Sequence, residues 1–255
     1  MNDQTTIKEN AKRSTLARLA STVLLFLFFW ASQATYFLHL PSRLFSQQTL
    51  IQYQWIGVYE GHIWELLFAL AFIGIVSKGQ WSDYGLNLKN WKLSLRILWK
   101  FSIVFTFIVI AWNVVPAVMR GSVDFGTLGP ATPFNVAAWM FFEWIFVGFS
   151  EEVMFRGLLH TRLLRVWPGK WCIAGFTLSH ATLATTILFC LAHVDPIHLH
   201  IYWPQLLFAF GLGIYYSTLR EKTGSLLNPI LAHGISDGLS ITAIYILHAV
   251  LHGAH

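Results

Sequence analysis

The stretch FSEEVMFRGLLH, residues 149–160, places two adjacent glutamates and one arginine among phenylalanine, valine, methionine and leucine. Such charges are costly inside an apolar environment unless they are paired. The composition of the chain shows which environment to expect, because 55% of its 255 residues are hydrophobic and only 11% are charged. Soluble domains carry about 25% charged residues. The composition therefore predicts an integral membrane protein.

The apolar residues predict an all-α fold, a polytopic bundle of about seven transmembrane helices. One crossing needs about 20 mostly apolar residues, and seven windows qualify: 16–40, 54–76, 97–118, 134–157, 173–193, 202–219 and 226–251. No linker-like tract divides the chain, so residues 1–255 are expected to form a single integral membrane domain. The first window is not followed by a small-x-small cleavage site, so we do not expect a signal peptide. Cys172 and Cys190 are interpreted as packing residues.

The basic residues predict the orientation, because cytoplasmic loops are enriched in Lys and Arg. Fourteen of the 17 lie on one side, either outside the windows or, for Arg18 and Lys100, in the first few residues of the first and third windows: Lys8, Lys12, Arg13, Arg18, Lys78, Lys89, Lys92, Arg96, Lys100, Arg162, Arg165, Lys170, Arg220 and Lys222. The other side receives only Arg43 and Arg120. We therefore expect a cytoplasmic N-terminus. The net charge of +5 then reflects membrane topology, and no basic stripe predicts nucleic-acid binding.

Helix geometry separates the three charges of the opening stretch. Residues four apart share one face of an α-helix, so Glu152 and Arg156 can pair. Glu151 points about a quarter turn away and is expected to lack a partner, which leaves it available for proton transfer. A plainer interpretation places all three charges at the cytoplasmic rim of the membrane, where charged side chains reach water.

Two later windows carry polar residues at helical spacing. FCLAH ends on His193, and HGISD places His233 and Asp237 four apart on one helix face. A single histidine on an apolar helix is more often a packing residue than a catalyst. Two histidines on different windows, in a chain that also carries a glutamate pair, favour a catalytic site.

These motifs make the chain resemble the CAAX protease and bacteriocin-processing family of intramembrane endopeptidases, also called the Abi family. That family is marked by E-E-x-x-x-R, F-x-x-x-H, a glycine-bearing helix, and H-x-x-x-N or H-x-x-x-D. The matching positions are Glu151-Glu152-x-x-x-Arg156, Phe189-x-x-x-His193, Phe208-x-x-Gly211 and His233-x-x-x-Asp237. The resemblance covers about residues 134–240, which would form the CAAX-protease-like catalytic core.

The resemblance implies a glutamic-type protease that hydrolyses a peptide bond with an activated water. Glu151 would be the general base, and His193 would help to hold the water. His233 would donate to the developing oxyanion. Asp237 stands where prenyl-protein proteases of the family typically carry Asn; an ionised Asp cannot donate, so we expect it to orient His233. Orienting or structural roles would fall to Glu152, Arg156 and Phe189.

The sequence favours no cofactor, but it leaves zinc as an alternative. Glu151, His193 and His233 can supply three ligands and an open position, although the chain lacks an H-E-x-x-H pair. A second cluster lies in HVDPIHLH, residues 193–200, which contains His193, Asp195, His198 and His200. We interpret that segment as a polar loop outside the membrane.

The predicted topology separates the site residues in depth. In a regular serpentine, Glu151 and His233 lie toward the cytoplasmic ends of their helices, whereas His193 lies toward the outer end of its own. One solution is a single helix over residues 134–166, about 50 Å long, with the glutamates near its middle. The other is that residues 173–183 lie at the interface, so that the fifth span begins later and ends deeper. We expect some combination of the two.

The preferred prediction is an endopeptidase in a lipid bilayer, the inner (cytoplasmic) membrane of a bacterium. Its substrate would be the C-terminal or membrane-proximal segment of a membrane-associated protein, either lipidated or carrying a sorting tag. The alternative is a non-enzymatic immunity or scaffold protein that keeps the motif residues as buried ion pairs. A weaker third option is a transporter with a proton path through Glu60, His62 and Glu65, although we find no inverted repeat.

Overall fold

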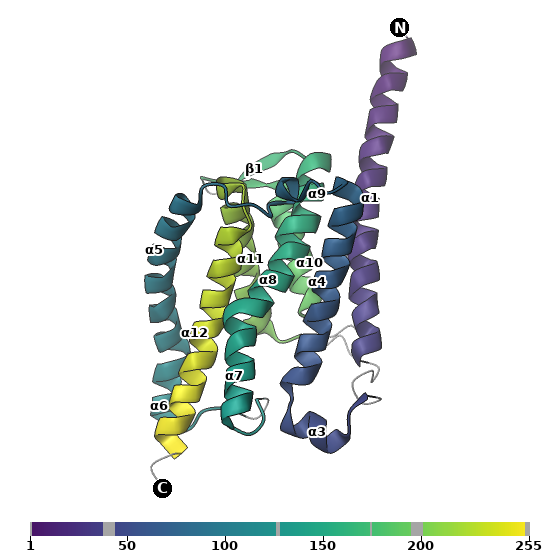
Figure 1. The fold of residues 1–255 in the computed structure, drawn as a ribbon. Helices are drawn as coiled ribbons and strands as arrows, with labels where there is room; N and C mark the ends of the chain where they lie inside the picture. The colour runs from purple at the N-terminus through teal and green to yellow at the C-terminus, as the bar shows by residue number, and fades with distance from the viewer. Residues whose placement is uncertain (1, 38–43, 126–127, 174, 195–200, 253–255) are drawn as a thin grey trace.

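The computed structural model describes residues 2–37, 44–125, 128–173, 175–194 and 201–252, and it is nearly all-α. Its helices lie side by side in a bundle and alternate in direction (Figure 1). Four segments are long and apolar enough to cross a membrane: Ser14–Ala31, Trp55–Ser77, Trp91–Arg120 and Leu227–Leu251. The chain is therefore an integral membrane protein, as its composition predicts.

The N-terminal part of the chain contributes three long helical passes. Its elements are α1 (Asn2–Phe37), α3 (Gln47–Gln52), α4 (Trp55–Ser77), the 3₁₀ helix η1 (Trp81–Tyr84), α5 (Trp91–Val109), the π-helical η2 (Ile110–Val114) and α6 (Val115–Arg120). Helices α5, η2 and α6 are continuous and form one pass. The first turns of α1 project beyond the rest of the bundle, on the side where η1 lies (Figure 1).

Residues 133–166 form one continuous helix, called the central helix below. Its segments are α7 (Pro133–Phe141), the π-helical η3 (Phe142–Phe146), α8 (Val147–Glu152), the π-helical η4 (Val153–Leu159) and α9 (His160–Val166). The junction residues keep helical φ and ψ, so the helix is not interrupted. Thr132 caps its start by accepting a hydrogen bond from the Asn135 backbone N–H. The predicted long helix is confirmed, and the glutamates lie near its middle.

A β-hairpin follows where the fifth predicted window begins. Strands β1 (Lys170–Ile173) and β2 (Phe176–Ser179) pair antiparallel around Gly175, whose φ is +83°. The Ser179 side chain accepts a hydrogen bond from the Thr182 N–H, so helix α10 (His180–Ala192) starts there. The predicted start at residue 173 is therefore wrong, because the residues before His180 form strands and a turn. The later start agrees with the second solution to the depth problem.

The C-terminal part contributes α11 (Trp203–Thr223) and α12 (Leu227–His252). Gly224, with φ of +70°, ends α11 in the left-handed conformation that glycine adopts without strain. The connection between α10 and α11 includes residues 195–200, which lie outside the described residues. The loop interpretation of Asp195, His198 and His200 therefore stays a prediction.

Glycines let α12 approach the central helix closely. A Cβ atom added to Gly234 would lie 2.2 Å from the carbonyl oxygen of Trp144, and one added to Gly148 would lie 2.7 Å from the carbonyl oxygen of Ile230. Small residues permit such contacts between membrane helices. The close approach places His233 beside the central helix.

Gly213 mediates a close contact between α10 and α11. A Cβ added to Gly211 would have nothing within 4 Å, whereas one added to Gly213 would lie 2.9 Å from Thr186. Gly211, the glycine of the sequence motif, therefore does not make this contact. The helix face that packs against α10 is set by tertiary contacts, which the motif does not report.

We predict that Gly234→Ala destabilises the full-length chain by about 1–3 kcal/mol, because the added methyl group meets backbone atoms of Trp144. The matched control is Gly211→Ala, which should leave stability unchanged or raise it, since alanine is favoured over glycine in helices by about 0.8–1.0 kcal/mol. Thermal unfolding in detergent measures both. Equal midpoints for the two variants would contradict the packing described.

Candidate active site

A cavity of about 660 Å³ opens where α1, α4, the central helix, α10, α11 and α12 meet. Apolar side chains such as Phe29, Phe142 and Leu212 line part of it. The histidine and acidic residues that line it are His62, Glu65, Glu143, Glu151, His193, His233 and Asp237. The four predicted catalytic residues therefore lie around one cavity, although they come from three separate helices.

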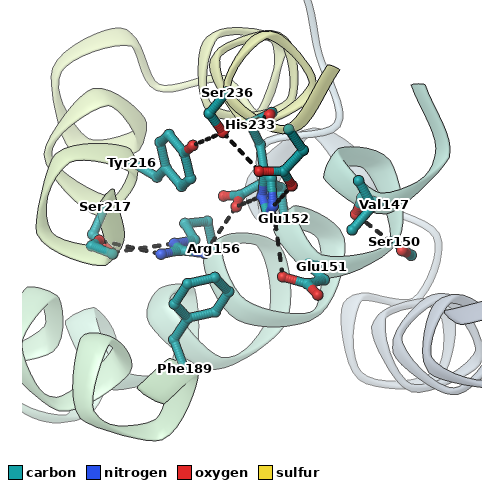
Figure 2. Close-up of polar contacts among 12 residues, drawn as sticks. Val147, Ser150, Glu151, Glu152, Arg156, Phe189, Tyr216, Ser217, His233 and Ser236 are labelled. Atoms are coloured by element: carbon teal, nitrogen blue, oxygen red, sulfur yellow. Dashed lines mark hydrogen bonds and ion pairs between the residues drawn. The ribbon is translucent and has the colours of Figure 1, made fainter. Parts of the chain in front are cut away.

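Glu152 is fully buried and joins the central helix to α12. Its Oε1 accepts a hydrogen bond from Arg156 Nη1 at 2.8 Å, and it lies 2.8 Å from Nδ1 of His233 (Figure 2). Arg156, also fully buried, donates to the Gly213 carbonyl oxygen at 3.2 Å and to the Ser217 hydroxyl at 3.4 Å. The predicted Glu152–Arg156 pair is therefore confirmed. The rim interpretation is wrong for this pair, because neither side chain has any exposed surface.

Phe189, which was expected to have an orienting or structural role, packs against Arg156 and His193. Its ring centroid lies 4.3 Å from the guanidinium carbon of Arg156 and 4.7 Å from the ring centroid of His193. An aromatic face over a buried guanidinium gains cation–π stabilisation. Phe189 therefore contacts both the structural arginine and a candidate catalytic histidine.

Glu151 has partners on two other helices, so the expectation that it has none is wrong. Its Oε1 lies 3.2 Å from Nε2 of His62 on α4, and its Oε2 lies 3.7 Å from Nε2 of His233 on α12. Both partners are more than 80 residues away along the chain. The spacing of residues within one helix predicts only contacts inside that helix, so it cannot predict these contacts.

His233 lies among three carboxylates. Its Nδ1 faces Glu152, and its Nε2 lies 3.1 Å from Oδ2 of Asp237 and 3.7 Å from Oε2 of Glu151. An ionised carboxylate only accepts hydrogen bonds, so an imidazole protonated on both nitrogens satisfies these contacts. The ring of Tyr216 stacks on the imidazole at 5.1 Å between centroids. Asp237 thus contacts the histidine that it was expected to orient.

His193 terminates α10 and lines the same cavity as Glu151. Its Nδ1 lies 2.8 Å from the carbonyl oxygen of Phe189 and must donate to it, which leaves Nε2 available. The late start of α10 and the long central helix therefore remove the depth problem. Among the described residues, the polar contacts of Glu151 are with His62 and His233, so any link to His193 requires a bridging molecule.

Three ionisable residues in the cavity were not assigned to this site from the sequence: His62, Glu65 and Glu143. The first two were associated only with a transporter path, because the first three windows carry no family motif. The available signal was their spacing, since His62 and Glu65 are three apart on a mostly apolar helix and must face protein or water. Glu143 lies eight residues before Glu151 on the central helix.

The side chains that could bind a metal ion together in the structure are not the set that the sequence suggested for zinc. Among the described residues, the set whose ligand atoms all lie within 4.8 Å of one another is His62, Glu65 and Glu151. His193 and His233 do not belong to it. The expected set of Glu151, His193 and His233 therefore does not converge in this arrangement.

We predict that Arg156→Met destabilises the chain by about 3–5 kcal/mol, because it leaves the buried Glu152 carboxylate without its cation. The control is Arg165→Met, which removes an exposed ion pair with Asp83 at 3.7 Å and should cost about 1 kcal/mol or less. Unfolding midpoints and the amount of protein in the membrane measure both effects. Similar losses of stability in the two variants would show that the buried ion pair contributes no more to stability than the exposed one.

Comparison with protein families gives a match that spans the residues of this site. Residues 133–239 match the family described as Type II CAAX prenyl endopeptidase Rce1-like. The match runs from the start of the central helix into α12 and contains all the predicted catalytic residues. Comparisons with curated proteins and with solved structures gave no match. Residues 133–239 are therefore similar to type II CAAX prenyl endopeptidases of the Rce1-like family.

Proposed function

We propose that this protein is an intramembrane endopeptidase that hydrolyses a peptide bond near the C-terminus, or in a membrane-proximal segment, of a membrane-associated protein. The observation that carries the proposal is the convergence of Glu151, His193 and His233 on one cavity within the membrane bundle. The similarity of residues 133–239 to the Rce1-like family supports the reaction class. The substrate that we propose is a lipidated or sorting-tagged C-terminal segment.

In the proposed reaction, Glu151 is the general base. A water held between Glu151 and His193 transfers a proton to the carboxylate as its oxygen attacks the carbonyl carbon of the scissile bond. Nε2 of His193 can accept a hydrogen bond from this water, because Nδ1 already donates to Phe189. When the C–N bond breaks, Glu151 returns the proton to the leaving amine, so the protons balance.

His233 is placed to stabilise the negative charge that forms on the carbonyl oxygen. Its Nε2 faces the cavity between Asp237 and Glu151, so an N–H there can be shared with an incoming oxyanion. Asp237 keeps the imidazole charged and oriented, and Glu152 holds its other nitrogen. The oxyanion donor is therefore fixed before the substrate arrives.

We also propose that the whole chain is one domain and that seven helical passes cross the membrane. The passes are α1, α4, α5 to α6, the central helix, α10, α11 and α12. Support for one domain comes from Phe29, His62 and Glu65, which lie outside the family match and still line the cavity. The distribution of basic residues supports a cytoplasmic N-terminus. The membrane that we propose is the inner membrane of a bacterium.

We predict that Glu151→Gln lowers the cleavage rate by about 10²–10⁴-fold, because glutamine keeps the shape but cannot accept the proton. Cells carrying this variant should accumulate an uncleaved membrane protein, which mass spectrometry of the membrane fraction identifies. Glu60→Gln is the control, since Glu60 lies on α4 outside the residues that line the cavity. Full biological activity of Glu151→Gln at normal protein level would instead indicate a non-enzymatic immunity or scaffold protein.

We predict that Asp237→Asn keeps part of the activity whereas Asp237→Ala loses most of it. Asparagine retains an oxygen that accepts from Nε2 of His233 but lacks the charge, and alanine retains neither. The loss should appear mainly in kcat, because the residue acts on the transition state through His233. Cleavage of the protein that accumulates in the Glu151→Gln cells provides the assay. An Asp237→Ala enzyme with unchanged kcat would remove Asp237 from the mechanism.

A further inference from the structure

The two ends of the helix bundle differ in charge. The β-hairpin and η1 lie at one end, called the hairpin end below, and α3 and the start of α7 lie at the opposite end (Figure 1). Basic residues gather at the hairpin end: Lys78, Lys89, Lys92, Arg96, Arg162, Arg165, Lys170, Arg220 and Lys222. The opposite end has Arg120, in the last turn of α6. Because basic residues favour the cytoplasmic side of a membrane, the hairpin end is expected to face the cytoplasm.

The cavity extends from the middle of the bundle toward the opposite end. Helices α4 and α11 both run toward the hairpin end, so their first residues lie farthest from it. On α4 the cavity lining runs from Val58 to Glu65, within the first half of the helix. On α11 it begins at Gln205, the third residue, whose side chain is exposed. The cavity therefore reaches the surface near the start of α11.

The short length of α10 leaves room for this part of the cavity. The helix starts at the hairpin and has 13 residues, so it is about 20 Å long, whereas the central helix is about 50 Å long. Its C-terminal residues Phe189 and Ala192, and the adjoining His193, line the cavity. His193 therefore lies inside the bundle, and the cavity continues past it toward the opposite end.

Packed side chains close the bundle between the cavity and the hairpin end. On the central helix, the cavity lining ends at Phe155. Leu159 and Leu163, which follow toward the hairpin end, have at most 1% exposure. They belong to one core cluster with Ile73 of α4 and Ala181 of α10. The described part of the chain therefore closes the cavity on this side, so water and substrate are expected to enter from the opposite end.

We propose that the cavity opens on the non-cytoplasmic side of the membrane and that its substrate is a protein segment exposed on that outer side. The orientation of the cavity does not depend on catalysis, whereas the consequence for the substrate rests on the proposed function. The partner is then a membrane protein whose cleaved bond follows or precedes its transmembrane helix on the outer side. A bond in a cytoplasmic tail would face the closed end of the bundle.

Labelling of single cysteines with a membrane-impermeant maleimide tests the orientation without any need for activity. One full-length chain keeps only Cys172, which is exposed in the hairpin, and carries Cys190→Ser. Two others carry Cys172→Ser and Cys190→Ser together with Gln205→Cys or Ala192→Cys. Gln205 lies near the start of α11, whereas Ala192 lies deeper, so the reagent must enter the cavity to reach it.

The Gln205→Cys and Ala192→Cys variants should react with the maleimide in spheroplasts, where the outer side is exposed. The chain that keeps Cys172 is the matched control, and it should react only in inverted membrane vesicles. Each signal is normalised to that of the same variant in detergent. Reaction of Ala192→Cys only in inverted vesicles, or reaction of Cys172 in spheroplasts, would overturn the proposal.

The position of the cut tests the consequence for the substrate. The substrate is the membrane protein that accumulates in cells carrying Glu151→Gln, and mass spectrometry of the fragments made by the wild type locates the cleaved bond. This bond should lie in a segment on the outer side, and a bond in a cytoplasmic segment would refute the substrate assignment. If no protein accumulates, the proposed function fails, while the labelling pattern still decides the orientation of the cavity.

Discussion

The arrangement of the site depends on one buried carboxylate, that of Glu152. It has no exposed surface, and it contacts both Arg156 on its own helix and His233 on α12. Arg156 extends the connection to α11 through the Gly213 carbonyl oxygen. Because a buried charge is tolerated only when its partners are in place, this carboxylate fixes the relative positions of three helices. The neighbouring Glu151 is thereby held at the edge of the cavity.

Depth in the membrane is the second constraint. The central helix is long enough to place its glutamates near its middle, and α10 begins only after the β-hairpin. His193, at the C-terminal end of α10, therefore reaches the same cavity as Glu151. The glycine contacts of Gly148 and Gly234 bring α12 to the same level. A regular serpentine of straight helices would not bring these three helices together at one depth.

The sequence predicted features that depend on one helix, and it missed features that depend on packing between helices. The Glu152–Arg156 pair and the shared face of His233 and Asp237 follow from a spacing of four residues. The contact between His62 and Glu151 joins residues 89 apart, and no periodicity reports it. The hairpin was included in a helical window because hydropathy alone does not distinguish a short apolar strand from a helix.

A double-mutant cycle between Glu152 and His233 tests the central claim most directly, because this contact joins the central helix to α12. The free energy of unfolding would be measured for Glu152→Gln, His233→Gln and the double variant in detergent. The structure predicts a coupling energy of about 1–3 kcal/mol, since each substitution leaves the other group without its buried partner. Losses that add to within about 0.5 kcal/mol would contradict the claim that this contact positions the site.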